Sequence, residues 1–204
     1  MVLDAIEVLG QDGVTLVGND TGGALCQIAV TERPERVGRL VLTSCDYREN
    51  FPPPEFRVLV EAARRRGGLK ALLTPLGLRP ARQLPQAFGR LAKRPLDAQA
   101  SDSYVLPALQ SAAVRDDLRR VLLGLNVVHT LRAERLGGFD RPALIAWSRD
   151  DAFFPSRDGE ALTAALPNAR LEWIEDAYTF SPEDQPERLA GLIAAFARES
   201  EAAA

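Results

Sequence analysis

Apolar positions along this chain fall into two patterns, continuous runs and helically spaced stretches. The mainly apolar runs lie at residues 14–17, 37–43 and 142–147, and with the stretch 169–174 they predict strands. The near-continuous apolar character of 37–43 is typical of a parallel strand that is covered on both faces. The helically spaced stretches lie at residues 2–9, 24–31, 157–166 and 186–198. Because parallel strands need crossover helices, this order predicts a parallel α/β sheet.

The middle of the chain has a different spacing of apolar residues. After the segment Phe51-Pro52-Pro53-Pro54, no strand pattern recurs until residue 142. Prolines and glycines break this stretch into short amphipathic segments. Helices are expected at residues 55–66, 69–76, 85–91 and 113–125. The pattern therefore predicts an α/β core at residues 1–46 and 139–204, with an all-helical cap inserted at residues 47–138. The core would hold a partial parallel sheet of about four strands, with helices on both faces.

The most informative local motif joins the first strand to the next helix. Residues 18–23 read Gly-Asn-Asp-Thr-Gly-Gly and form a strand–turn–helix pattern, the layout of a nucleophile elbow. Such a turn lifts its central side chain clear of the sheet, and glycines allow the strand and helix to approach closely. The central residue is Asp20. An aspartate here predicts a carboxylate nucleophile that attacks carbon and forms an ester-linked intermediate.

Composition and charge are those of an ordinary soluble globular protein. The chain has 204 residues, of which 46% are hydrophobic and 26% charged, with a net charge of −3. Basic residues cluster at 64–66, but no aromatic residues are interleaved with them. This cluster therefore predicts a solvated helix end rather than a nucleic-acid site.

Several classes of site and location are excluded by what the sequence lacks. Cys26 and Cys45 form no metal-ligand spacing and no disulfide pattern, which excludes zinc and favours the cytoplasm. No basic leader or apolar run of roughly 20 residues is present, so no signal peptide or membrane span is expected. The glycines around Asp20 do not have dinucleotide-binding spacing, and no phosphate loop occurs, so no metal or organic cofactor is expected.

Five segments in order carry a family resemblance. They are the turn at residues 17–24, the stretch 34–42, the helical insert, the stretch 139–151 and the loop 176–180. Together they resemble the α/β-hydrolase superfamily, in particular the branch with an aspartate nucleophile that includes haloalkane dehalogenases and epoxide hydrolases. The resemblance spans essentially the whole chain. It implies that Asp20 is the nucleophile and that a small-molecule substrate binds between core and cap.

The same resemblance assigns further residues. Asp151 ends a Trp-Ser-Arg-Asp-Asp stretch and matches the acid that orients a histidine, although an aspartate there also caps the following segment. Asp46 is a second candidate acid, or a turn residue. The backbone N–H of Thr21 matches one oxyanion donor. Tyr104 is a candidate proton donor in the cap, or an ordinary packing tyrosine.

Two departures from the family pattern limit these assignments. The loop that usually reads Gly-His-Phe has Thr179 at the histidine position, and threonine cannot act as a base near neutral pH. The chain's only histidine, His129, lies upstream in the cap, which is the wrong order for the triad. The chain also begins one helix before the first predicted strand. This predicts an N-terminally truncated hydrolase, or an oligomer that covers the open sheet edge.

Three functions therefore stay open. The first is a hydrolase of a small apolar ester, epoxide or haloalkane that uses Asp20. The second is a non-catalytic relative that binds a small ligand. The third is an inactive fragment of a longer hydrolase.

Overall fold

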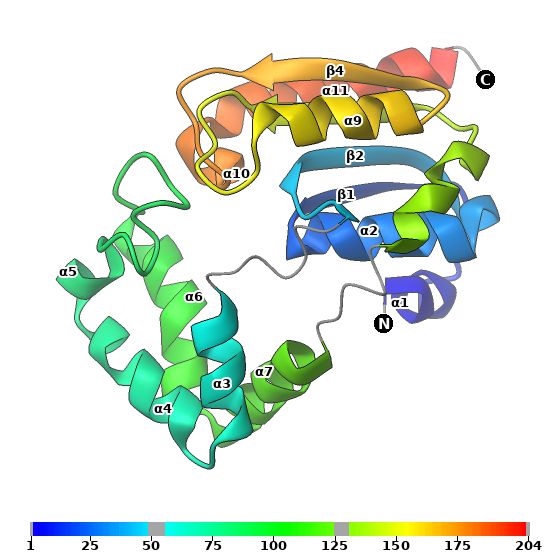
Figure 1. Ribbon diagram of the computed structural model, residues 1–204. Helices are drawn as coiled ribbons and strands as arrows, with labels where there is room; N and C mark the ends of the chain where they lie inside the picture. The colour runs from blue at the N-terminus through cyan, green and yellow to red at the C-terminus, as the bar shows by residue number, and fades with distance from the viewer. Residues whose placement is uncertain (1, 49–55, 125–130, 203–204) are drawn as a thin grey trace.

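A parallel sheet of four strands forms one part of the molecule, at the upper right of Figure 1. The computed structural model describes residues 2–48, 56–124 and 131–202. The strands are β1 (Val14–Asp20), β2 (Val37–Cys45), β3 (Ala143–Ser148) and β4 (Ala169–Ile174), and they lie side by side in chain order. The expected α/β fold with about four parallel strands is confirmed.

The strand register brings the carboxyl ends of β1, β2 and β3 together. Gly18 pairs with Leu42 and Asp20 with Cys45, and Leu42 pairs with Ile145 on its other side. In open parallel sheets, ligands bind outside the carboxyl ends of the strands. A ligand site is therefore expected among the loops that follow these strands.

Helices cover both faces of the sheet. On one face lie α1 (Val2–Val8), α2 (Thr21–Glu32), η5 (Leu131–Gly138) and α9 (Ser156–Ala165), and on the other lies α11 (Pro186–Ala202). Alternate strand residues point to opposite faces. Leu42 and Ile145 accordingly belong to the first core cluster, whereas Val41 and Leu144 pack with Phe196 in the second. A short 3-10 turn, η1 (Pro34–Arg36), precedes β2.

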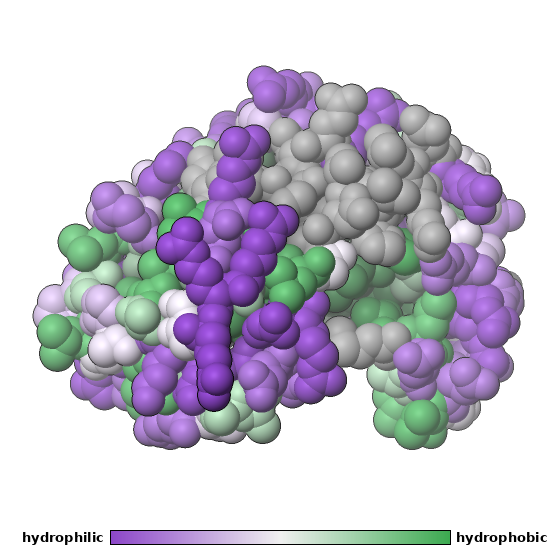
Figure 2. All heavy atoms as spheres, turned by 60° about the horizontal axis from the view of Figure 1, so that its bottom comes forward, coloured by the Kyte–Doolittle hydropathy of each residue, from purple (hydrophilic) through white to green (hydrophobic). Residues whose placement is uncertain are grey.

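A second group of helices lies beside the sheet layer (Figure 1). It comprises α3 (Arg57–Arg64), α4 (Gly68–Leu73), η4 (Thr74–Gly77), α5 (Arg79–Arg82), α6 (Ala98–Gln110) and α7 (Ala112–Gly124). Ala63, Leu69 and Leu122 form a small buried cluster among them. The face that Figure 2 brings forward carries many outward hydrophilic side chains with apolar side chains scattered between them.

The insert differs from the sequence prediction at two places. The helix expected at residues 85–91 is wrong, because that segment forms consecutive turns in which the Phe88 N–H donates to the Arg82 carbonyl at 2.9 Å. In contrast, α6 was not expected. It is started by Asp97, whose carboxylate accepts hydrogen bonds from the N–H groups of Gln99 and Ala100 at 2.7 and 3.3 Å. Pro107 hides this helix in the sequence, but it lies near the carboxyl end, where it does not prevent the helix.

Two element bounds near the site also differ from the prediction. β1 continues to Asp20 instead of ending at residue 17, and a short helix, α10 (Ser181–Asp184), precedes α11. Over the residues that the structure describes, no helix combines the length and apolar character that a bilayer crossing requires.

Candidate active site

Asp20 lies at a sharp and strained turn between β1 and α2. Its φ is 53° and its ψ is −133°, a conformation that residues other than glycine rarely adopt. The turn is also tightly packed. A Cβ atom on Gly18 would lie 2.7 Å from Cys26 Sγ, and one on Gly23 would overlap Cys45, whereas Gly22 faces open space. The predicted close approach of strand and helix thus needs glycine at positions 18 and 23 but not at 22.

The Asp20 side chain lines a cleft of about 270 Å³. The cleft is lined by residues of the β1–α2 turn, of α6 and of the segment around α10: Asn19, Asp20, Thr21, Gly22, Tyr104, Phe180, Pro182 and Glu183. Three residues chosen from the sequence, Asp20, Thr21 and Tyr104, are therefore brought together at one cleft.

The environment of Asp20 favours the protonated carboxyl more than water does. Burial raises the pKa of Asp20 to about 6, the Thr21 backbone N–H opposes this shift, and the negative charge of Asp151 adds to it. Above pH 6 the side chain is mostly a carboxylate, the form that can act as a nucleophile.

Asp151 contacts the residue that occupies the expected histidine position. Its Oδ1 accepts hydrogen bonds from the backbone N–H groups of Phe153 and Phe154 at 2.8 and 2.9 Å, and from the Thr179 hydroxyl at 2.9 Å. Its Oδ2 is buried and forms no hydrogen bond of ordinary geometry with a described residue. Burial raises the pKa of Asp151, and these donors, with the Ser44 hydroxyl, oppose the shift. Asp151 thus caps the following turn and also faces position 179.

Asn19 ties the Thr179 loop to the turn at Asp20. Its Nδ2 donates hydrogen bonds to the Thr43 hydroxyl and to the Thr179 backbone carbonyl, both at 2.8 Å. Thr179 itself is fully buried. This amide bridge was not anticipated, although Asn19 directly precedes the residue singled out in the sequence.

Asp46 is a fully buried carboxylate behind the cleft. It follows Cys45, the register partner of Asp20, and neither of its carboxylate oxygens forms a hydrogen bond of ordinary geometry with a described residue. Burial raises the pKa of Asp46 to about 8, the charge of Asp20 adds to the shift, and the Thr21 hydroxyl lowers it. A surface turn residue would not be buried in this way.

Tyr104 faces Asp20 across the cleft from α6. Its hydroxyl donates a hydrogen bond to the Glu183 carboxylate, and burial together with this acceptor raises the pKa of Tyr104 to about 12. Its ring also packs near Phe88 and Phe180, with ring centroids 6.0 Å away in each case. Sequence reasoning missed the contribution of Phe180, Pro182 and Glu183. The signal available was their position directly after the loop that carries Thr179.

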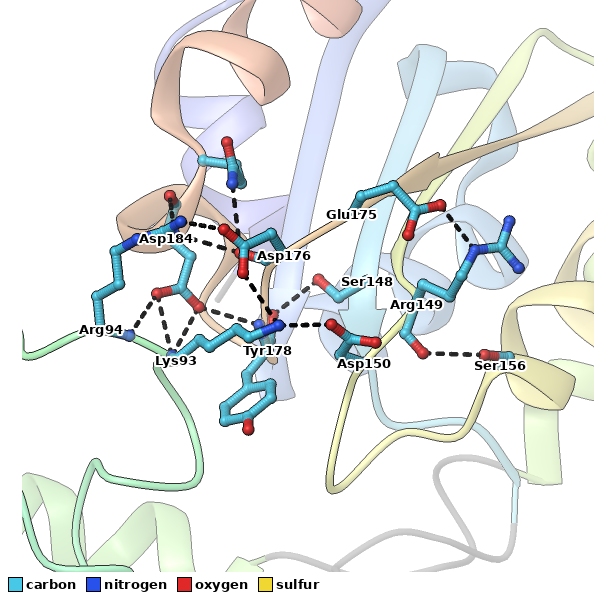
Figure 3. Close-up of polar contacts among 11 residues, drawn as sticks. Lys93, Arg94, Ser148, Arg149, Asp150, Ser156, Glu175, Asp176, Tyr178 and Asp184 are labelled. Atoms are coloured by element: carbon cyan, nitrogen blue, oxygen red, sulfur yellow. Dashed lines mark hydrogen bonds and ion pairs between the residues drawn. The ribbon is translucent and has the colours of Figure 1, made fainter.

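The loop that carries Thr179 is fastened to the insert by Asp184 (Figure 3). The Asp184 carboxylate accepts hydrogen bonds from the backbone N–H groups of Lys93 at 2.8 and 3.0 Å, Arg94 at 3.0 Å and Tyr178 at 2.9 Å. The Lys93 ammonium also reaches the exposed Asp150 carboxylate at 2.6 Å. A single buried carboxylate therefore joins segments that lie about 90 residues apart in the chain.

Replacing Asp184 with asparagine is expected to lower the free energy of unfolding by about 3 kcal/mol. The amide nitrogen cannot accept, so part-buried N–H groups lose their partner, and each such loss costs about 1–3 kcal/mol where water does not replace it. Urea unfolding measures the difference. Asp150→Asn is the matched control, because it removes an exposed ion pair worth about 0–1 kcal/mol. Equal losses in the two variants would contradict this role for Asp184.

His129 falls outside the described residues, so no histidine belongs to the described site. Within residues 2–48, 56–124 and 131–202, no group of three or more His, Cys, Asp or Glu side chains is arranged to hold a metal ion.

Comparison with known proteins identifies the fold family. Residues 1–186 match the family model described as alpha/beta hydrolase fold. Among curated proteins, an uncharacterized hydrolase, YugF of Bacillus subtilis, is 25% identical over 96% of this chain and 69% of its own length. A 2-hydroxy-6-oxononadienedioate/2-hydroxy-6-oxononatrienedioate hydrolase of Dechloromonas aromatica is 27% identical over 81% of this chain and 55% of its own length. The chain thus spans part of each relative.

Solved structures show the same fold. An alpha/beta hydrolase fold protein from Burkholderia ambifaria has a TM-score of 0.78 at 20% identity, covering 94% of this chain and 69% of that one. The haloalkane dehalogenase DatA from Agrobacterium tumefaciens has a TM-score of 0.74 at 20% identity, covering 97% and 70%.

Proposed function

The chain belongs to the alpha/beta hydrolase fold family, and we propose that it acts on a small apolar ester, epoxide or haloalkane with Asp20 as the nucleophile. The observation that carries this proposal is the strained conformation of Asp20 at the mouth of a cleft. Strain of this kind, at a residue other than glycine, is a feature of functional sites. The dehalogenase among the structural neighbours is consistent with the Asp-nucleophile branch.

The proposed first step is a displacement at carbon. An oxygen of the Asp20 carboxylate forms a bond to the electrophilic carbon of a haloalkane, the carbon–halogen bond breaks, and halide leaves. With an epoxide, the ring C–O bond breaks instead, and Tyr104 is the proposed donor of a proton to the new alkoxide. The Thr21 N–H, at the start of α2, is the proposed donor to an oxyanion.

The second step, hydrolysis of the ester on Asp20, needs a base that activates water. Position 179, next to Asp151, holds a threonine hydroxyl rather than an imidazole. This observation favours a second candidate function, a relative that binds a small ligand without turning it over. It also implies that a reactive substrate would stay attached to Asp20.

Intact-mass measurement after incubation with a haloalkane and an epoxide tests the proposal. The unmodified chain is expected to gain one alkyl group, and Asp20→Asn none. Asp150→Asn is the control, because it removes an exposed carboxylate that does not line the cleft. Equal labelling of the unmodified chain and Asp20→Asn would remove Asp20 from the mechanism. No adduct together with measurable ligand binding would favour the second candidate.

A further inference from the structure

The charges that line the Asp20 cleft are all of one sign. Asp20 stands on the turn side and Glu183 on the α10 side, and none of the described lining residues is lysine, arginine or histidine. Glu183 accepts a hydrogen bond from the neutral hydroxyl of Tyr104. Neither carboxylate forms an ion pair with a described lysine or arginine, so the negative charge in the cleft is not neutralised from its own walls.

Carboxylates close to the cleft differ in this respect. Asp102, two residues before Tyr104, pairs with Arg79 at 2.7 Å and with Arg82 at 2.5 Å. Asp176, in the loop before Thr179, pairs with Lys93 at 3.0 Å. Counter-ions are thus supplied to these two acidic groups outside the cleft but not to the two inside it.

A further carboxylate stands directly behind the cleft. Asp46 is fully buried, and its pKa responds to the charge of Asp20 and to the Thr21 hydroxyl, both of which belong to residues that line the cleft. The mutual repulsion of Asp46 and Asp20 helps to raise the pKa of Asp46. With a pKa of about 8, Asp46 is mostly protonated at pH 7, and a positive charge in the cleft would favour its ionised form.

Aromatic rings form the remaining wall. Tyr104 and Phe180 line the cleft with their centroids 6.0 Å apart, and Phe88 lies behind them at 6.0 and 6.2 Å. The three rings are tilted by 39–56° to one another, and two of them, Tyr104 and Phe180, line the cleft. The face of an aromatic ring attracts a cation, and groups of such rings bind methylated ammonium ions.

We propose that the cleft takes a substrate or ligand with two unlike ends, one of them apolar and the other an organic cation, a methylated ammonium group. Glu183 and the rings of Tyr104 and Phe180 hold the cationic end, which leaves the other end of the molecule facing Asp20. This inference rests on the proposed function only in treating the cleft at Asp20 as the substrate site. An anionic molecule would meet two uncompensated carboxylates there.

Calorimetric titration with two unreactive probes of the same shape tests the charge preference. Choline carries a trimethylammonium group, and 3,3-dimethylbutan-1-ol replaces it with an uncharged tert-butyl group. We expect choline to bind the unmodified chain at least about tenfold more tightly than the alcohol. Equal affinities, tighter binding of the alcohol, or no binding of choline would overturn the proposal.

Two variants test whether Glu183 is responsible for the preference for choline over the alcohol. Glu183→Gln keeps the shape of the side chain and is expected to lower the choline preference by about tenfold. Glu187→Gln is the matched control, because it makes the same charge change at an exposed position in the first turn of α11. Equal loss in both variants would show a diffuse charge effect and overturn the site, and circular dichroism verifies that both fold.

The outcome of the choline titration is independent of whether Asp20 is labelled. Choline has no leaving group, so its binding does not depend on the chemistry proposed for the carboxylate. Selective choline binding without any alkyl adduct would support the cation site and count against the hydrolase mechanism. An alkyl adduct without selective choline binding would do the reverse.

Discussion

Replacing Thr179 with histidine is expected to convert persistent labelling of Asp20 into repeated turnover. The Thr179 hydroxyl lies 2.9 Å from Asp151 Oδ1, so an imidazole at this position has a carboxylate to orient it and to stabilise its charged form. General-base catalysis contributes typically about 10²–10⁴-fold. Product formed per chain from a haloalkane or epoxide should therefore rise by about that factor. Intact mass should show that the adduct no longer accumulates.

Two controls separate base catalysis from a change in packing. Thr179 is fully buried, so the larger ring overpacks its site at a cost of about 1–3 kcal/mol, and a melting curve must show that the variant is folded. Thr179→Asn can donate a hydrogen bond to Asp151 but cannot act as a base. The double variant Thr179→His/Asp20→Asn retains the base without the nucleophile. Equal rates for folded Thr179→His and Thr179→Asn would contradict the prediction.

The core was predictable from the sequence because its signals are local. Continuous apolar runs such as 37–43 are buried on both faces, so the run itself reports a strand in a covered parallel sheet. The strained turn at Asp20 was also predictable, since glycines at 18 and 23 bracket it and the structure has no room for a side chain at either. Bounds were less predictable, and β1 runs three residues further than the apolar run because Asn19 and Asp20 still pair with β2.

The insert and the far side of the cleft were not predictable, because contacts distant in sequence decide them. Residues 85–91 have helical spacing, yet they form turns. A hydrogen bond from the Phe180 N–H to the Leu91 carbonyl, at 2.7 Å, holds these turns against the Thr179 loop. Glu183 lies at the cleft beside Tyr104, which donates a hydrogen bond to it from 79 positions earlier in the chain. Local composition carries no trace of such partners.

The burial of Asp46 gives a second large expected effect, on stability rather than turnover. Asp46→Asn should make the chain more stable than the unmodified protein at pH 8 but not at pH 4. The pKa of Asp46 is about 8 in the folded protein and about 3.9 when unfolded. Because the folded value is raised, the folded state binds the proton more tightly. The proton on Asp46 therefore stabilises the folded state fully below pH 4, and this stabilisation is lost as the pH rises to 8.

The size of the effect follows from the width of this window. Each pKa unit corresponds to about 1.4 kcal/mol, so the unmodified protein should lose about 4 kcal/mol through Asp46 between pH 5 and 8. Asparagine has no proton to lose, and its own unpartnered amide costs about 1–3 kcal/mol at every pH. Urea unfolding at pH 4, 5, 6, 7 and 8 should therefore show that the advantage of Asp46→Asn over the unmodified protein is largest at pH 8, shrinks as the pH falls and is absent at pH 4.

In the same urea experiment, Asp20→Asn should change the free energy of unfolding over a lower pH range than Asp46→Asn does. The pKa of Asp20 is about 6, so its own contribution is lost between about pH 4 and 6. Its charge is also one cause of the raised pKa of Asp46, so removing it should shift the Asp46 window to lower pH. The two substitutions act on one coupled pair, and their effects should not add. Parallel curves for the unmodified chain and Asp46→Asn from pH 5 to 8 would mean that Asp46 keeps its charge in the folded state. The repulsion behind the cleft would then have to be neutralised by a partner that the described residues do not supply.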